Sequence, residues 1–438
     1  MAGISPEQGP PLWGPMAFFC TAPLFVVAAG LALAPDPNAL SARWWPQALL
    51  ATHLGTLGFA GSVMLGALYQ MLPVVASSPV PAPRLSHVVN AALLAGTAAL
   101  AWGLARHERA ALLVGGALLA LAFVLFVVPI AWALWRAPAR TATVIGMRIS
   151  LMGLAVVVTL GILMTLGRAG VGTSFGARSL FYLHVTFGGA LWIGGLIAAV
   201  SWQVLPMFYL CEEASTATRV TTLAGLVLSG IALGALLLAN VATAWVYAVA
   251  AAPAMLAVWL VHPLSSLRAL RRRRRRRADE SLRFWMLGLC CGPLCLVAAV
   301  ASAISEDPRW PVLLGFTALW GWAGLIMHGM LTRIVPFLVW FHRYASLVGK
   351  QPVPAMKQLL PARHVRVALV AHGVSLLAGW VAIAASTHVS PWLSGAFGAA
   401  LVVTGGALAS EIARVVRHVG REPCDSASHE ARAGQTRG

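Results

Sequence analysis

The sequence predicts an all-α fold: a polytopic membrane helical bundle of about twelve transmembrane helices. Of its 438 residues, 59% are hydrophobic and 10% are charged, whereas soluble domains carry about 25% charged residues. Apolar runs of roughly 20 residues recur along the chain, and each is long enough to cross ~30 Å of hydrocarbon as a helix. A membrane β-barrel would instead show alternating segments of about 10 residues.

Twelve apolar spans follow one another from the N-terminus to residue 417. Their expected bounds are 14–34, 47–76, 86–106, 109–136, 143–166, 180–210, 217–239, 242–262, 282–303, 311–342, 364–386 and 390–417. Residues 1–417 are therefore expected to form a single transmembrane domain. The polar remainder, 418–438, is expected to be a disordered cytoplasmic tail, because it has too few apolar residues to pack.

The positive charge of the chain predicts its orientation. The formal net charge is +18, but the arginines lie beside apolar spans, where they determine topology, so no nucleic-acid partner is expected. Basic residues concentrate in the loops after even-numbered spans, most densely at Arg271–Arg277. The positive-inside rule then places both termini in the cytoplasm and the bundle in the inner (cytoplasmic) membrane. The basic run is read as a topology anchor, with binding of anionic lipid head groups as the alternative.

Spans 2, 6 and 10 carry an internal repeat. Span 2 reads HLGTLGFAGSVMLGALYQMLP from residue 53, and span 6 reads HVTFGGALWIGGLIAAVSWQVLP from residue 184. Each begins with a histidine and ends in aromatic-Gln-x-Leu-Pro, and span 10 ends in an analogous Arg-x-Val-Pro-Phe. The prolines, Pro73, Pro206 and Pro336, are 133 and 130 residues apart, which is four spans each time. We therefore expect three quasi-equivalent four-helix units, at about 14–136, 143–262 and 282–417.

Three four-helix units in one twelve-span chain resemble the catalytic subunit of haem-copper oxidases and nitric oxide reductases. The segment from His53 to Pro73 also resembles the NnrS family, haem- and copper-containing membrane proteins associated with nitrogen-oxide metabolism. The architectural resemblance covers nearly the whole chain, but its motifs are confined to 52–75, 183–208 and 328–344. It implies that a span-2 histidine ligates low-spin haem, a place matched by His53, and that a span-6 histidine ligates copper, a place matched by His184.

The chain departs from the oxidase pattern in two spans. Span 10 has His328 alone, with Met330 where a second histidine would fall, and span 7 has no histidine at all. The resemblance implies a histidine pair in span 10 and adjacent copper ligands in span 7. The chain is therefore expected not to be a complete terminal oxidase or nitric oxide reductase.

The candidate cofactor-binding residues are His53, His184 and His328, and the first two are also candidate metal ligands. Neutral imidazole binds haem iron, and a histidine inside an apolar helix is costly unless it has a partner. The alternative role is a hydrogen bond to a carbonyl or hydroxyl across a Gly-rich helix interface. Because the chain has no C-x-x-C-H motif, the expected haem is b-type and non-covalent, with copper as the other candidate cofactor.

Depth in the membrane separates these three histidines. His53 lies 20 residues before its proline and His184 lies 22 before, whereas His328 lies only 8 before. If the prolines are level, His328 is deeper by roughly 20 Å, at about 1.5 Å per residue. We therefore expect His53 and His184 to share a site and His328 to have a secondary role. His388, between spans 11 and 12, is a further candidate partner.

Four other polar residues are candidates near the cytoplasmic ends of the spans. Gln70 and Gln203 precede their prolines by three residues and are expected to hydrogen-bond across the repeat axis. Arg333 and His342 are candidates for a polar cluster at the end of span 10. Snorkelling of Arg333 within an interfacial aromatic belt is the simpler interpretation.

Sulfur and acidic residues give weaker indications. Met64 and Met71 share a helical face with His53, and thioethers bind Cu(I), but packing is the commoner role of methionine. Cys291 and Cys295 share a face in span 9 and are read as buried small residues rather than metal ligands. All thirteen acidic residues are expected in loops, in termini or near span ends, which argues against proton pumping through a carboxylate relay.

Three hypotheses of function follow. The first is a membrane protein that binds haem, with copper as the other candidate cofactor. It would be related to respiratory redox or nitrogen-oxide metabolism and would have no oxygen-reducing activity. Its partners would be the lipid bilayer and electron-transfer proteins of a respiratory chain. The second is a transporter or permease that uses the pseudo-threefold bundle, although many carriers have two inverted halves rather than three parallel repeats. The third is a non-catalytic assembly partner of a respiratory complex.

Overall fold

A computed structural model describes residues 11–172, 176–239, 241, 243–274, 279–385 and 391–419. Within these residues it has twelve helices that are long and apolar enough to cross a membrane, and it contains helices without strands. The prediction of an all-α polytopic bundle of twelve spans is confirmed. His388 and the tail from residue 420 lie outside the described residues, as do Arg275–Arg277 of the basic run.

Eight spans are single helices, and four are interrupted. The single helices are α1 (Trp13–Leu33), α4 (Leu85–Arg106), α5 (Arg109–Arg136), α6 (Ala142–Arg168), α9 (Thr216–Leu238), α12 (Glu280–Ile304), α16 (Ala362–Ala384) and α17 (Pro391–Val416). The interrupted spans are α2 (Pro46–His53), η2 (Leu54–Gly61) and α3 (Ser62–Val75); α7 (Ala177–Thr186), η3 (Phe187–Gly194) and α8 (Gly195–Tyr209); α10 (Ala244–Leu256), η4 (Ala257–Val261) and α11 (His262–Arg271); and α13 (Arg309–Phe316), η5 (Thr317–Gly324) and α14 (Leu325–Tyr344). The short η6 (Ala345–Leu347) and α15 (Met356–Leu359) follow α14.

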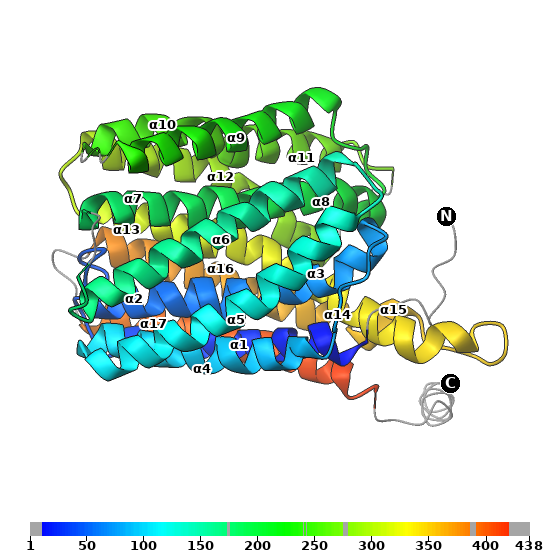
Figure 1. The fold of residues 1–438 in the computed structure, drawn as a ribbon. Helices are drawn as coiled ribbons and strands as arrows, with labels where there is room; N and C mark the ends of the chain where they lie inside the picture. Colours follow the sequence, from blue (N-terminus) through cyan, green and yellow to red (C-terminus); the bar gives the residue numbers. More distant parts are fainter. Residues whose placement is uncertain are drawn as a thin grey trace.

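The spans lie side by side, and the start of α1 and the end of α17 are at the same end of the bundle (Figure 1). α1 packs against α17 as well as against span 2, so the first and last spans close the arrangement. Spans 6 and 10 are the most buried, at 72% of their apolar windows, compared with 28–56% for the others. We call the end where α1 begins and α17 ends the terminus end, and the other end, where α2, α7 and α13 begin, the distal end (Figure 1).

Spans 2, 6 and 10 share a feature that the sequence did not predict, an eight-residue π-helical segment. η2, η3 and η5 end at Gly61, Gly194 and Gly324, and each of these glycines lies 12 residues before the matched proline. A Cβ on each would come within 3.0–3.2 Å of the carbonyl oxygen five residues earlier, which is tighter than ordinary contact. Glycine therefore fits the end of each π-segment, and the three repeats agree in backbone conformation as well as in sequence.

The π-segments meet at the centre of the bundle. η5 packs against both η2 and η3, and Phe59 of η2 lies edge-on to Trp320 of η5 with 5.9 Å between ring centroids. π-segments are rare and occur frequently at functional sites. The centre of the molecule, where the three repeats meet, is therefore the first place to look for a site.

Candidate functional site: two histidines at the π-segments

His53 and His184 face each other near the distal ends of spans 2 and 6. His53 is the last residue of α2, directly before η2, and His184 lies three residues before η3. Their ring centroids are 6.4 Å apart and the ring planes are inclined by 28°. The proximity that their matched depth predicts is confirmed. Their role as ligands stays a prediction.

The hydrogen bonds of the two rings leave the same nitrogen free on each. His53 Nδ1 donates to the Leu49 carbonyl oxygen at 2.7 Å, and His184 Nδ1 donates to the Val157 carbonyl oxygen at 3.1 Å. A carbonyl oxygen only accepts, so both Nδ1 atoms carry the proton and both Nε2 atoms keep a lone pair. Fixing one ring nitrogen in this way is how proteins orient a histidine whose other nitrogen binds a metal.

Glycines shape the surroundings of the pair. The ring of His184 lies against Gly161 of α6, where an added Cβ would be 3.1 Å from His184 Cε1. Gly55 and Gly189, on the π-segments, have no heavy atom within 4 Å of an added Cβ. Both histidines are half-buried rather than enclosed. The π-segments therefore have open positions at Gly55 and Gly189, close in sequence to the two histidines.

An arginine lies near the distal edge of this region. The Arg43 guanidinium, in the α1–α2 loop, is 4.8 Å from the ring centroid of Phe181, which is three residues before His184. It is also 5.1 Å from the centroid of the Trp44 ring. The arrangement places one cation and two aromatic rings at the rim of the histidine pair, near the distal end.

The residues of the pair fit a haem iron better than a metal ion held by protein ligands alone. With metal–nitrogen bonds of about 2.0 Å to each ring, two imidazole centroids on opposite sides of one ion would stand about 6 Å apart. The observed 6.4 Å is close to this value. Among the described residues, no group of three or more His, Cys, Asp and Glu side chains is placed to hold a metal ion. Two axial histidines suffice for haem, because the porphyrin provides the remaining ligands.

His328 does not join this pair; it belongs to a second buried group at the terminus-end side of the π-segments. Its Nδ1 is 3.1 Å from Nδ1 of His372, on α16, and its Nε2 is 3.2 Å from Oε2 of Glu411, on α17. His372 Nε2 in turn donates to the Trp320 carbonyl oxygen at 3.1 Å. The three side chains are 0–4% exposed. Both nitrogens of His328 are therefore engaged, and His328 is not placed to join the pair of His53 and His184.

Glu411 is an acidic residue whose burial the sequence did not predict. It is near the end of its span, as predicted, but its carboxyl is buried and bonded to a buried histidine. His372 was not among the candidates predicted from the sequence. The signal was present, because a histidine and a glutamate inside apolar spans are functional candidates by default. What the sequence could not show is that spans 10, 11 and 12 bring them together.

The other polar candidates have separate surroundings. Gln203 is exposed. Gln70 is buried, but its side-chain oxygen has no hydrogen-bond partner among the described residues. The hydrogen bond that we expected between these glutamines across the repeat axis is therefore not seen in the described residues. Arg333 pairs with Asp279 and lies 5.9 Å from the centroid of the Tyr209 ring. His342 Nδ1 donates to the Leu338 carbonyl oxygen of its own helix. Arg333 is thus in an ion pair near the terminus end, rather than extended freely to the surface.

The sulfur-containing candidates pack in the core. Met64 and Met71 are 4% and 8% exposed and belong to the hydrophobic core. Cys291 and Cys295 are buried in α12. Cys291 Sγ packs beside Gly321, where an added Cβ would be 3.2 Å from it. These contacts agree with the packing interpretation of both sets.

No model of a known protein family matches the chain, and no curated protein matches it either. The argument for a function therefore rests on the residues and their geometry.

Proposed function

We propose that the protein is a redox-related membrane protein that binds a b-type haem between His53 and His184. The observation that carries the proposal is the matched pair: two imidazoles 6.4 Å apart, each with Nδ1 bonded to a backbone carbonyl and Nε2 unprotonated. A haem held this way supplies one-electron chemistry, and a bis-histidine iron suits electron transfer or sensing. Copper between the same two nitrogens is the alternative cofactor.

The roles of the chain's own residues follow from their contacts. His53 and His184 would provide the two axial nitrogens, and the carbonyls of Leu49 and Val157 would hold the rings in the ligating orientation. The open positions beside Gly55 and Gly189 give a flat group room to approach the helices. Arg43 at the distal rim is placed to pair with an anionic substituent such as a propionate.

The place of the protein in the cell follows from the same proposal. We infer an inner-membrane location with both termini in the cytoplasm, from the distribution of basic residues. Membrane electron-transfer proteins, or a nitrogen-oxide pathway of the kind the NnrS resemblance implies, would then be the partners. The absence of the oxidase histidines in spans 7 and 10 keeps oxygen reduction out of the proposal.

The test is a reduced-minus-oxidised absorbance spectrum with metal analysis, on protein purified in detergent from haem-replete cells. We expect a Soret band and about one haem per chain, both lost in His53→Ala and in His184→Ala. His262→Ala is the matched control, because His262 is a buried histidine bonded to Ser201 in spans 8 and 6, away from the pair. This control should keep the haem.

The alternatives give different results. If metal analysis finds copper instead of iron, and the copper is lost in His53→Ala and in His184→Ala, the proposed site is retained and the cofactor is copper. Well-folded wild-type protein without haem or copper would refute the proposal and favour the transporter or the assembly partner. Haem that survives in both His53→Ala and His184→Ala would place the haem elsewhere in the bundle.

A further inference from the structure

The hydrogen bonds of Glu411, His328 and His372 connect the three side chains in one row. His372 Nε2 carries a proton because its partner, the Trp320 carbonyl, only accepts. With His372 neutral, its Nδ1 accepts from His328 Nδ1, so His328 donates there. One proton then remains between His328 Nε2 and Glu411 Oε2, 3.2 Å apart. It sits on the glutamic acid or on the histidine, and the hydrogen bonds are complete in either case.

The rings are held in place for this exchange. The His372 ring stacks on Trp320 with 4.1 Å between centroids and 12° between planes. Phe284 covers His328 at 4.5 Å. Buried aromatic contacts on both histidines restrict ring rotation, which keeps the nitrogens aligned with their partners.

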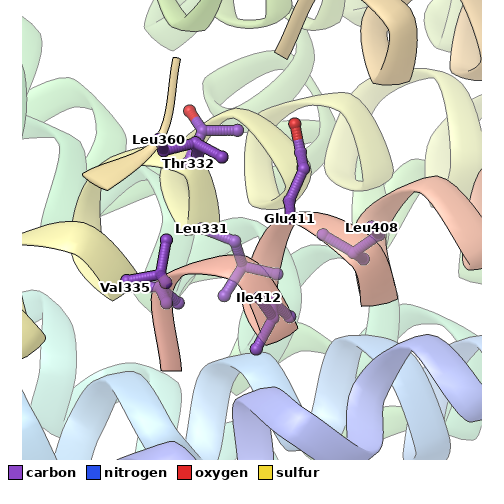
Figure 2. Close-up of a pocket in the computed structure, with 8 residues that line it drawn as sticks. Leu331, Thr332, Val335, Leu360, Leu408, Glu411 and Ile412 are labelled. Carbon is purple, nitrogen blue, oxygen red and sulfur yellow. The ribbon is translucent and has the colours of Figure 1, made fainter. Parts of the chain in front are cut away.

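Glu411 lies on the terminus-end side of the group, because it is five residues before the end of α17. Glu411 lines a narrow crevice together with residues of α14 and α17 and with Leu360, which lies just before α16 (Figure 2). Its second oxygen, Oε1, is buried without a hydrogen-bond partner among the described residues. Burying an acceptor without a hydrogen bond costs free energy, and binding a proton or a proton donor at Oε1 would remove that cost. His364, at the start of α16, is near enough to Glu411 for their charges to interact.

We propose that Glu411, His328 and His372 form a proton-transfer chain that takes up a proton at the terminus end and carries it to the π-segments at the bundle centre. A proton enters on Glu411, Oε2 passes its proton to His328 Nε2, and His328 Nδ1 passes its own proton to His372 Nδ1. Each step breaks one bond to hydrogen and forms another, and the net gain is one positive charge on His372. The proposal is independent of the haem site, since no histidine is common to both.

The charged groups around the chain come from three helices. On α16 and α17, His364, Arg363 and Arg414 form an interacting set next to Glu411. On α12, Glu280 is paired with Arg283 at 2.9 Å and with Arg366 of α16 at 3.0 Å.

The test is infrared difference spectroscopy of the full-length protein in lipid nanodiscs, as pH is changed. Only a protonated carboxyl group shows the high-frequency C=O stretch, which moves to lower frequency in D₂O. We expect such a band to disappear as pH rises in the wild type and to be absent throughout in Glu411→Gln. Glu280→Gln is the matched control, because Glu280 is a buried carboxyl paired with two arginines outside the group; this variant should keep the band. Glu411→Asp, which should shift the band, serves if the glutamine variant does not fold.

Two further variants separate a transfer chain from an isolated buried acid. His328→Gln and His372→Gln should each move the pH midpoint of the Glu411 band, because the proton is shared. Leu360→Trp, at the crevice, should slow its exchange with D₂O several-fold while the fold is kept. The proposal would be overturned if the wild type showed no pH-dependent carboxyl band assignable to Glu411. It would also be overturned if both histidine variants kept the pH midpoint of the wild type. Unchanged exchange in Leu360→Trp would overturn entry through the crevice.

Discussion

At the scale of single residues, the structure sorts the buried histidines by the partners of their ring nitrogens. In His53 and His184, one nitrogen donates to a carbonyl and the other is free. In His328, both nitrogens meet other titratable side chains. The first pattern suits ligation of a metal and the second suits proton transfer. The sequence separated His328 from the other two only by its depth, because hydrogen-bond partners on neighbouring spans cannot be read from a single span.

Gly161 provides a residue-scale test of how tightly the His184 ring is held. In Gly161→Ala the new Cβ would come 3.1 Å from His184 Cε1, so the ring must move by a few tenths of an ångström. We expect the variant to keep its haem but to shift the Soret maximum or the reduction midpoint, since axial-ligand orientation tunes the iron. Redox titration with optical detection measures both quantities.

The matched control is Gly234→Ala, a helical glycine on α9 with nothing within 4 Å of an added Cβ. Its spectrum and midpoint should equal those of the wild type. A Gly161→Ala protein with haem and an unaltered spectrum and midpoint would contradict the placement of His184 on the iron.

At the scale of elements, the span count and the three prolines were predictable, but the π-segments were not. Apolar length alone identifies a membrane span, and a proline near the end of a helix is visible in the sequence. A π-segment leaves no such mark, because α- and π-helix differ by the step of the hydrogen bond and not by composition. The glycine that ends each π-segment can be explained only from the structure, which shows the carbonyl oxygen of the residue five positions earlier beside it.

Gly61→Ala tests whether the π-segment of span 2 depends on its terminal glycine. The only atom near the added Cβ is the Thr56 carbonyl oxygen at 3.2 Å, so the substitution opposes the π conformation itself rather than packing between helices. We expect a loss of stability of about 1–3 kcal/mol, as for other overpacked sites. The measurement is thermal unfolding in detergent followed by circular dichroism, with Gly234→Ala again as the open control. A Gly61→Ala melting temperature equal to that of the control would show that η2 does not require glycine.

At the scale of the whole molecule, both ends of the described chain lie at the same end of the bundle, which twelve spans require (Figure 1). The positive-inside rule predicts that this terminus end faces the cytoplasm. Arg140, exposed between α5 and α6, lies at the terminus end, and Asn38, exposed between α1 and α2, lies at the distal end. Single cysteines at these two positions therefore report opposite sides of the membrane.

We expect Asn38→Cys to react with a membrane-impermeant maleimide in intact spheroplasts, and Arg140→Cys to react only after the membrane is opened. The wild type, with its own six cysteines, gives the background, and a native gel band confirms insertion of each variant. The result also decides the direction of the proposed proton chain, because Glu411 lies near the end of α17, on the terminus-end side of the group. If Arg140→Cys reacts in intact cells, the orientation is inverted, and the chain would draw its protons from outside the cell while the histidine pair lies toward the cytoplasm.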